Sequence, residues 1–371
     1  MELAPAPAVS ILKRRTGKLA KELRSAGLEG AIIAPGPNLI YYTGVSAHLF
    51  ERPFLLLVQS DGKAHLLAPK LEAGPFRVSI PLTVHAWDDT EGPSGAFKEL
   101  LGEISSKGRW GCDGRVPFGF LDHLLRKGLK VKPADGILQS IREVKEPEEL
   151  ELLRRSAAIL SGSILRVPDA LREGMTEKEL ARFIFEDAKS GGAEEVDPMV
   201  QSGARAADPH SVTSTKKIGR GDSVVVDVVS SYAGYAADIT RTFVLGGGAE
   251  VERVYHSVLS AQQKAIGSAK AGVATGKVDA AARGSLEKDG LAKYFIHRTG
   301  HGLGLEVHEA PYIVAGGRER LRSGMVFTVE PGAYIPGKLG VRIEDDVEIS
   351  KRGDGEVTTA KVPKEFGWWR R

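Results

Sequence analysis

The chain has 371 residues, more than one hydrophobic core usually holds, so two domains of roughly 100–250 residues each are expected. Its 51 basic and 48 acidic residues leave a net charge of only +3, which gives no basis for a nucleic-acid-binding surface. Cys112 is the single cysteine, so an internal disulfide is excluded and a reducing compartment is favoured.

The N-terminal segment MELAPAPAVSILKRR lacks the charged-then-apolar pattern of a signal peptide. No run of 18 apolar residues is present, so we expect no membrane-spanning segment. The sequence also contains no internal repeat of fixed period. These features together predict a cytoplasmic protein.

Residues 1–138 alternate between strand and helix patterns, which predicts a small α/β domain. Gly27 is a natural stop for the first helix, and Asp61-Gly62 is typical of a hairpin turn. The expected elements, in chain order, are a helix over 10–27, a strand over 30–34, a turn over 35–38, strands over 53–59 and 64–68, and helices over 95–106 and 118–128.

Residues 139–371 predict a larger α+β domain in which antiparallel hairpins carry acidic residues. A charged amphipathic helix is expected to begin at Pro147, and Pro168 should end or kink it. Thr176 begins a capping-box pattern before the next helix. The remaining expected segments are a connector over 137–147 and helices over 250–271 and 277–289.

Two aspartates lie in neighbouring strand-like segments, SVVVDVV and AADITRTFVL. If the hairpin is centred between Tyr232 and Ala233, Asp227 and Asp238 face each other, with Cβ atoms about 4.5–5.5 Å apart. Facing carboxylates repel without a cation, and this spacing suits a pair of metal ions ~3.5–4 Å apart. An aspartate at a bulge or strand end is the alternative for either residue.

Three of the nine histidines lie within a glycine-rich stretch of twelve residues, HRTGHGLGLEVH. His297 precedes His301 by four positions, and His308 follows His301 by seven. Because glycine lets backbone approach a site closely, this stretch predicts a functional site. His210, in ADPHS, is typical of a surface-loop histidine on composition alone.

Two glutamates complete the candidate site. Glu330 ends the apolar run MVFTV before a Pro-Gly turn, and Glu344 lies in VRIED. Either glutamate alone could be a solvated strand residue. Four carboxylates and one neutral imidazole would carry four negative charges, which balance two divalent cations. Oxygen-rich donors favour manganese or cobalt, with iron or zinc as further candidates, over a thiolate-rich zinc site.

As a set, DITRTF, GHGLGLEVHEAP, TVEPGAYIP and GVRIEDDV resemble the pita-bread metallopeptidases, which include methionine aminopeptidases, Xaa-Pro aminopeptidases and prolidases. The resemblance runs from about residue 140 to the C-terminus. It extends more loosely into the N-terminal domain through APGPNLIYYTG and IREVKEPEELELLRRSA, which points to the Xaa-Pro peptidases. It implies a pita-bread catalytic domain and a creatinase-like N-terminal domain.

The resemblance also implies an activity, a cofactor and an assembly. The activity is hydrolysis of the bond before proline in dipeptides or short peptides, by a hydroxide that bridges two divalent metal ions. The assembly is a homodimer. By the same resemblance Asp227 chelates one ion, His301 and Glu330 bind the other, and Asp238 and Glu344 bridge the two. Glu330 is further implied to shuttle a proton to the leaving nitrogen.

Five other residues match positions near the substrate in this family. His308 matches the histidine that stabilises the transition state, and His297 and His210 match histidines that shape the proline pocket. Tyr334 matches the tyrosine after the Glu-Pro-Gly sequence. Arg342 matches the arginine before the last glutamate.

Two positions depart from the family pattern. Val229 replaces a glycine that often follows the first ligand, and Tyr312 replaces an arginine that many prolidases have after HExP. That arginine would be a natural clamp for the free carboxylate of a dipeptide. Its absence leaves Arg342, Arg318 or Arg320 for this contact, with Tyr312 beside the substrate. It also leaves room for longer substrates.

The alternatives are therefore an Xaa-Pro dipeptidase and an Xaa-Pro aminopeptidase that acts on longer peptides. A metal-free binding module and creatinase-like hydrolysis without metals are disfavoured, because all five ligand positions are filled. The C-terminal Trp368-Trp369-Arg370-Arg371 either packs at a dimer interface or forms a frayed end.

Overall fold

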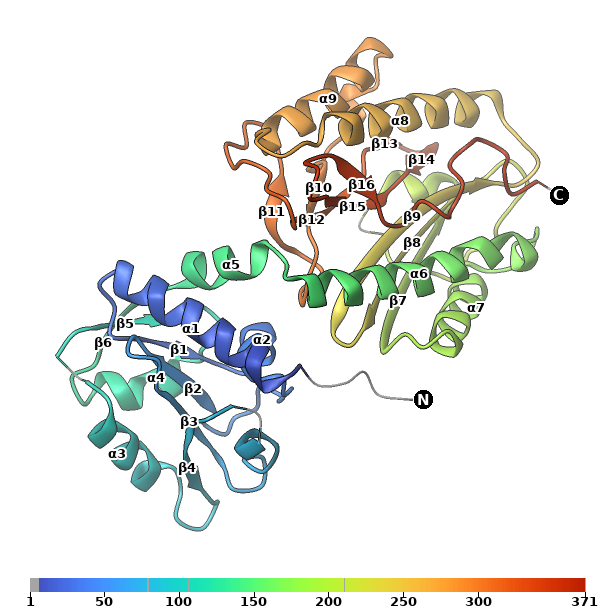
Figure 1. Cartoon of the computed structure of the whole chain (residues 1–371). Helices are drawn as coiled ribbons and strands as arrows, with labels where there is room; N and C mark the ends of the chain where they lie inside the picture. Colours follow the sequence, from blue (N-terminus) through green and yellow to red (C-terminus); the bar gives the residue numbers. More distant parts are fainter. Residues whose placement is uncertain (1–6, 79, 106, 210, 371) are drawn as a thin grey trace. The chain divides into compact units, whose positions relative to one another are not determined.

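The computed structural model describes residues 7–78, 80–105, 107–209 and 211–370. The chain forms two compact units, one that ends at Arg142 and one that begins at Glu143 (Figure 1). Each unit has its own cluster of buried apolar side chains. The division falls at the end of helix α5 (Asp135–Glu143), so the expected connector over 137–147 is largely helical. Apolar residues at helical spacing, including the buried Leu138, explain this helix.

The N-terminal unit contains a mixed six-stranded sheet with the order β4-β3-β2-β1-β5-β6. Strands β2 and β3 form the hairpin predicted at Asp61-Gly62. The predicted turn over 35–38 is wrong in its second half, because Pro37 begins helix α2, where its missing N–H costs nothing. The strands are β1 (Gly30–Ile33), β2 (Leu55–Gln59), β3 (Ala64–Pro69), β4 (Thr83–Trp87), β5 (Arg109–Cys112) and β6 (Lys130–Pro133). The other helices are α1 (Val9–Ser25), the 3-10 turn Pro75–Val78, α3 (Ser94–Glu103) and α4 (Phe118–Leu125).

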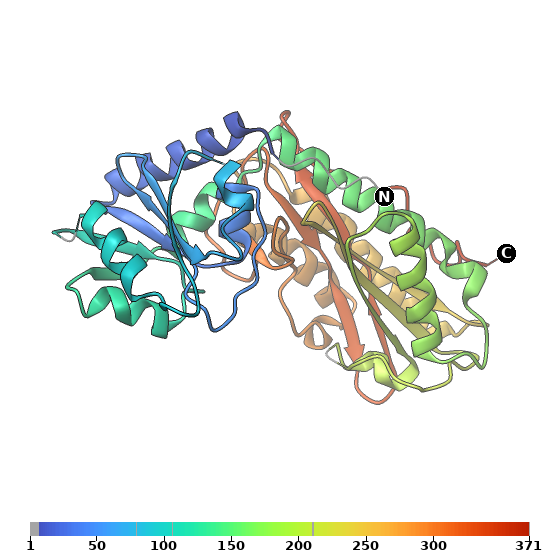
Figure 2. The same cartoon turned by 90° about the horizontal axis from the view of Figure 1, so that it is seen from below.

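The C-terminal unit places strands between two pairs of helices, α6 with α7 and α8 with α9 (Figures 1 and 2). Its sheets have the orders β7-β8-β9, β11-β10-β12-β15-β16 and β13-β14. The helices are α6 (Pro147–Ala170), α7 (Glu177–Ser190), α8 (Ala249–Ser268), α9 (Thr275–Lys288) and the 3-10 turns Gly203–Ala207 and Ala292–Tyr294. The strands are β7 (Glu195–Ser202), β8 (Ser223–Tyr232), β9 (Tyr235–Val244), β10 (Gly300–Gly302), β11 (Glu309–Ile313), β12 (Val326–Val329), β13 (Gly332–Ile335), β14 (Leu339–Arg342), β15 (Asp345–Ile349) and β16 (Gly355–Val357).

The helix signals read from the sequence act as expected. Thr176 caps α7 through its side-chain oxygen, and Glu179 bonds back to the Thr176 backbone. Helix α6 ends at Ala170, two residues after Pro168. In the described part of the chain, no helix is both long enough and apolar enough to cross a membrane.

The C-terminal tail packs on the unit's own core. The Trp369 ring contacts Tyr255 and Phe243, with ring centroids 5.8 Å and 5.6 Å away, and its indole N–H donates to the Val244 carbonyl at 3.1 Å. Trp369 is 8% exposed. The expectation of a frayed C-terminal end is therefore wrong for Trp369, because its ring packs against apolar side chains of the same chain.

Candidate metal centre

The hairpin of β8 and β9 carries both aspartates, but in a different register from the one predicted. Its two turn residues are Ala233 and Gly234, which both have positive φ, as a tight two-residue hairpin requires. Asp238 therefore pairs with Val229 and not with Asp227. The prediction that the two aspartates face each other is wrong, because the turn is centred one residue later. Residues two apart on a strand share a face, so both carboxylates still point to the same side of the sheet.

His301 lies at the centre of the short strand β10, between two glycines. A Cβ on Gly300 would lie 1.9 Å from the Thr328 carbonyl oxygen, and one on Gly302 would lie 2.1 Å from the Ala310 carbonyl oxygen. Any larger residue would force the neighbouring strands apart. The two glycines thus allow β11 and β12 to close on β10 and fix the backbone of the histidine.

Five side chains converge from these elements. Glu330 follows β12 and Glu344 lies between β14 and β15, while Asp227 and Asp238 come from the hairpin. His301 Nε2 lies 3.3 Å from Glu330 Oε1 and 3.8 Å from Asp238 Oδ2. Candidate ligand atoms of Asp238, His301 and Glu344 all lie within 4.8 Å of one another. All five expected ligands line one cavity of about 600 Å³.

The electrostatics of this cavity favour bound cations. Burial raises the pKa of Asp238 and Glu344 well above the ordinary values, and neighbouring carboxylates add to both shifts. Asp238 Oδ1 is buried and has no hydrogen-bond partner among the described residues. A donor set of carboxylates and one imidazole, with an uncompensated buried oxygen, fits a pair of divalent cations.

The pKa of Glu330 is shifted in the opposite direction from that of Asp238. Burial opposes its ionisation, but the hydrogen bond from His301 and the electrostatic interactions with His301, His297 and Arg342 outweigh burial and lower its pKa to about 2. Thr328 Oγ1 also donates to Glu330 Oε1 at 3.2 Å and accepts from the His301 backbone N–H at 3.1 Å. Thr328, which sequence reasoning missed, therefore links the glutamate to the histidine strand.

Arg342 is buried, and each of its three guanidinium nitrogens donates to a site residue. It donates to Asp227 Oδ2, to the Tyr334 hydroxyl at 2.8 Å and to Thr240 Oγ1 at 3.1 Å. Thr240 Oγ1 in turn donates to Glu344 Oε2 at 2.6 Å. The arginine thus orients two of the expected ligands, one directly and one through a threonine that the sequence did not single out.

The accessory histidines lie at different sides of the cavity. His297 Nδ1 donates to the Arg298 carbonyl at 2.7 Å, so its Nε2 accepts from the Tyr334 hydroxyl at 2.8 Å. Burial lowers the pKa of His297, which keeps this ring neutral. The exposed His308 ring lies 4.2 Å from the His301 ring, and partial burial lowers its pKa too. His210 lies outside the described residues.

Arg298 is among the cavity residues that sequence reasoning missed. Arg298 lines the cavity, and its guanidinium lies over the Tyr312 ring at 4.9 Å. Tyr312 is not among the described residues that line the cavity, and neither are Arg318 and Arg320. Its position next to His297 in the chain was the only sequence signal that could have identified Arg298.

Residues 151–351 match metallopeptidase family M24. The chain belongs to metallopeptidase family M24. In this M24 protein, residues 15–144 match the creatinase/prolidase N-terminal domain. These matches confirm the predicted pita-bread catalytic domain and creatinase-like N-terminal domain.

Relatives of this M24 protein match nearly its whole length. A probable dipeptidase PepE from Mycobacterium tuberculosis is 38% identical to this chain, and the match covers 96% of each of the two chains. An Xaa-Pro dipeptidase from Pyrococcus horikoshii is 33% identical, with 94% of this chain and 98% of the relative covered. The crystal structure of a prolidase from Thermococcus sibiricus has a TM-score of 0.90 at 36% identity, with coverage of 96% and 98%.

Proposed function

We propose that this M24 protein hydrolyses the peptide bond before proline in Xaa-Pro dipeptides, with two divalent ions, manganese or cobalt, as its cofactor. The observation that carries the proposal is the single cavity into which four carboxylates and His301 converge around the unpaired Asp238 Oδ1. The names of the relatives, Xaa-Pro dipeptidase and prolidase, support the substrate class.

The five converging residues would hold the ions in a division of labour. By the family resemblance, Asp227 would serve one ion and His301 and Glu330 the other, while Asp238 and Glu344 would serve both. When bound, such ions polarise the scissile carbonyl and lower the pKa of an attacking water. Arg342 keeps Asp227 and, through Thr240, Glu344 aimed into the cavity.

The proton is moved by Glu330. Its low pKa makes it a carboxylate at neutral pH, so Oε1 or Oε2 can accept a proton from the attacking water and pass it to the departing proline nitrogen. His308 stands at the cavity wall beside His301 and would donate a hydrogen bond to the oxygen that becomes negative. His297, held by Tyr334 and the Arg298 carbonyl, would border the proline ring, with His210 as a further proposed neighbour.

We assign the grip on the substrate's free carboxylate to Arg298. Arg342 is engaged by Asp227, Tyr334 and Thr240, whereas Arg298 lines the cavity and stacks on Tyr312. Tyr312 would then support this arginine from the position where many prolidases have an arginine of their own. Guanidinium and carboxylate can pair through two parallel hydrogen bonds.

Arg298→Gln is expected to lower kcat/KM for an Xaa-Pro dipeptide by about 10- to 100-fold, because a hydrogen bond to a charged group contributes roughly 1.5–3 kcal/mol. The loss should appear mainly in KM, and cleavage of a tripeptide should change much less. Arg318→Gln, on the exposed loop, is the matched control. Equal kinetics for the Arg298 variant and the control on the dipeptide would remove Arg298 from substrate binding.

Metal add-back tests the proposed function itself. Chelator-stripped protein is expected to be inactive, and manganese or cobalt to restore cleavage of a dipeptide that ends in proline. The same peptide extended by one residue at its C-terminus should be a poor substrate. Preference for the extended peptide would make the protein an Xaa-Pro aminopeptidase, and no cleavage of either peptide with any ion would refute the proposal.

A homodimer and a cytoplasmic location complete the proposal. The family resemblance supports the dimer, and the single free Cys112 is consistent with a reducing compartment. Sedimentation equilibrium of the metal-loaded protein measures the oligomeric state, and cell fractionation measures the location.

A further inference from the structure

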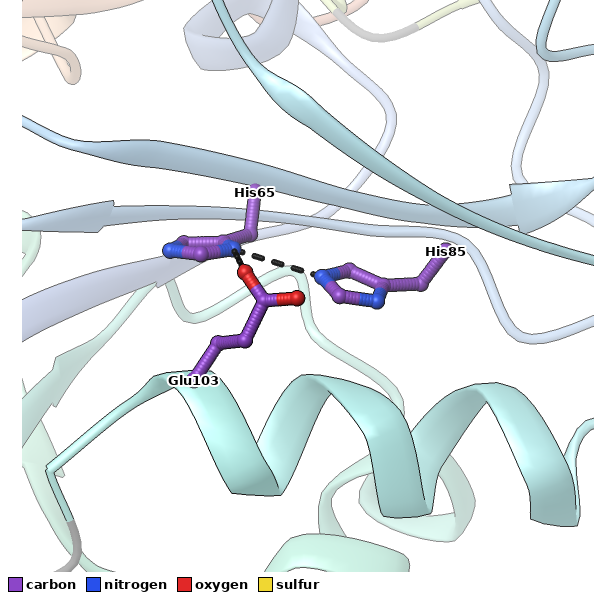
Figure 3. Close-up of side chains that lie close together, drawn as sticks. All are labelled: His65, His85 and Glu103. Atoms are coloured by element: carbon purple, nitrogen blue, oxygen red, sulfur yellow. Dashed lines mark hydrogen bonds and ion pairs between the residues drawn. The ribbon is translucent and has the colours of Figure 1, made fainter.

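A second group of metal-binding side chains lies in the N-terminal unit. Strand β3 carries His65 and the parallel strand β4 carries His85. His65 pairs with Thr83 and His85 pairs with Leu67, so the two histidines are diagonal neighbours on one face of the sheet. Figure 3 shows Glu103, at the end of α3, reaching from the helix toward both rings.

The spacing of the three side chains matches that around one tetrahedral ion. His65 Nδ1 lies 3.3 Å from His85 Nε2 and 3.6 Å from Glu103 Oε2. Zinc bonds of about 2.0–2.2 Å in tetrahedral geometry put neighbouring donor atoms about 3.3–3.6 Å apart. Candidate donor atoms of the three side chains all lie within 4.8 Å of one another. An ion could therefore enter between them with little movement of the backbone.

The outward-facing nitrogens of both rings have polar neighbours. His85 Nδ1 lies 3.9 Å from Glu99 Oε2, one helical turn before Glu103. His65 Nε2 lies 2.9 Å from the Gln59 side-chain amide. Metal-bound histidines usually donate their other N–H to a carboxylate or a carbonyl oxygen. With the Gln59 amide turned so that its oxygen faces His65, both rings could donate outward and present bare nitrogens inward.

Burial and access distinguish this group from a surface coincidence. Both histidines are 2% exposed, so their rings are held in place by packing. Glu103 is about half exposed and lines a hollow with Lys63, His65 and Thr83. Two fixed imidazoles with one reachable carboxylate can take an ion from solvent and leave its fourth position to water.

We propose that His65 Nδ1, His85 Nε2 and the Glu103 carboxylate bind one late first-row divalent cation, with Zn²⁺ as the best chemical match. Imidazole-rich sites suit zinc, copper and nickel, whereas the catalytic cavity offers mostly carboxylates. The bound ion would cross-link β3, β4 and the C-terminal end of α3. Its role is structural, and it is independent of the proposed peptidase function.

Zinc stoichiometry of the full-length protein tests this site. Chelator-stripped protein, equilibrated with Zn²⁺ alone, is expected to bind one ion more per chain than the Glu103→Ala variant. The Glu103→Ala variant should bind that ion at least tenfold more weakly than wild type. Glu99→Gln should lower the affinity about tenfold, as for other residues that orient a ligand. Glu103 is half exposed at a helix end, so its loss should leave the fold intact.

Glu91→Ala, an exposed glutamate just before the same helix, is the matched control and should keep the extra ion. Peptidase activity with manganese should be equal in wild type and all three variants, so failure of this site and failure of the proposed function are separable. Zinc-edge anomalous diffraction should find a peak between His65 and His85. Equal zinc content and affinity in wild type and Glu103→Ala, or zinc density only in the catalytic cavity, would overturn the proposal.

Discussion

Glu330→Gln is expected to lower kcat for an Xaa-Pro dipeptide by about 10²–10⁴-fold, the usual contribution of general acid–base catalysis. The wild-type side chain is a carboxylate at neutral pH, because the hydrogen bond from His301 and nearby positive charges overcome its burial and hold its pKa at about 2. Glutamine keeps the size of the side chain and one oxygen, but it cannot carry a proton from water to the leaving nitrogen. The variant should therefore fold and bind substrate without turning it over.

Three measurements make this prediction decisive. Initial rates with saturating manganese give kcat, metal analysis shows whether the variant still holds its ions, and thermal unfolding reports on the fold. Glu356→Gln, at an exposed strand position, serves as the matched control. A fully metallated Glu330→Gln protein with near wild-type kcat would exclude Glu330 as the proton carrier.

The acidic and imidazole residues of the catalytic cavity could be identified from the sequence. Charged residues such as Asp238 and Glu344 stand among apolar strand formers, where a charge is costly to bury without a partner. The helices were predicted for a similar reason, since caps and prolines such as Thr176 and Pro168 act within a few residues of the chain. The sequence therefore predicts those features that depend on residues close together in the chain.

The features that were missed depend on contacts between distant segments. The register of β8 and β9 was misjudged by two residues, because the turn is centred one residue later than predicted and requires Ala233 to adopt a positive φ that only its neighbour Gly234 suggests. Arg342 orients Glu344 through Thr240, which lies 102 residues away from the arginine along the chain. His65 and His85 become neighbours only because β3 and β4 run parallel. No periodicity in the sequence announces a parallel pairing of that kind.

Asp238→Asn is expected to stabilise the metal-free protein at pH 8 and to destabilise the metal-loaded protein. Burial and the neighbouring carboxylates raise the pKa of Asp238 in the folded state above its ordinary value of 3.8. The unfolded chain therefore ionises first as the pH rises. The stability that protonated Asp238 contributes is complete below about pH 4 and is lost as the pH rises through the folded-state pKa. Glu344 follows the same direction.

Other groups also titrate, and the variant shares them with the wild type. Glu330, whose pKa is lowered to about 2, affects stability only at acid pH, where it acts in the opposite direction. Glu143, whose pKa burial raises to about 8, adds to the loss of stability at high pH. The lowered pKa of His297 offsets part of that loss below about pH 6.5. The difference between wild type and variant removes the contributions of Glu143 and His297, and it leaves the effect of Asp238 together with the cavity carboxylates it interacts with.

Thermal unfolding at pH 5 and pH 8, with and without manganese, measures the effect. The metal-free variant is expected to have the higher Tm at pH 8, and each kcal/mol of stability regained should raise Tm by about 2–4 °C. The gap should shrink at pH 5, because the penalty that a raised folded-state pKa places on ionised Asp238 becomes smaller as the pH falls. Manganese should reverse the order, because ions that bind only the folded state stabilise the protein that keeps its ligand. If the metal-free variant were the less stable protein at pH 8, Asp238 would have to be satisfied without a cation. The case for a metal pair at these carboxylates would then lose its electrostatic basis.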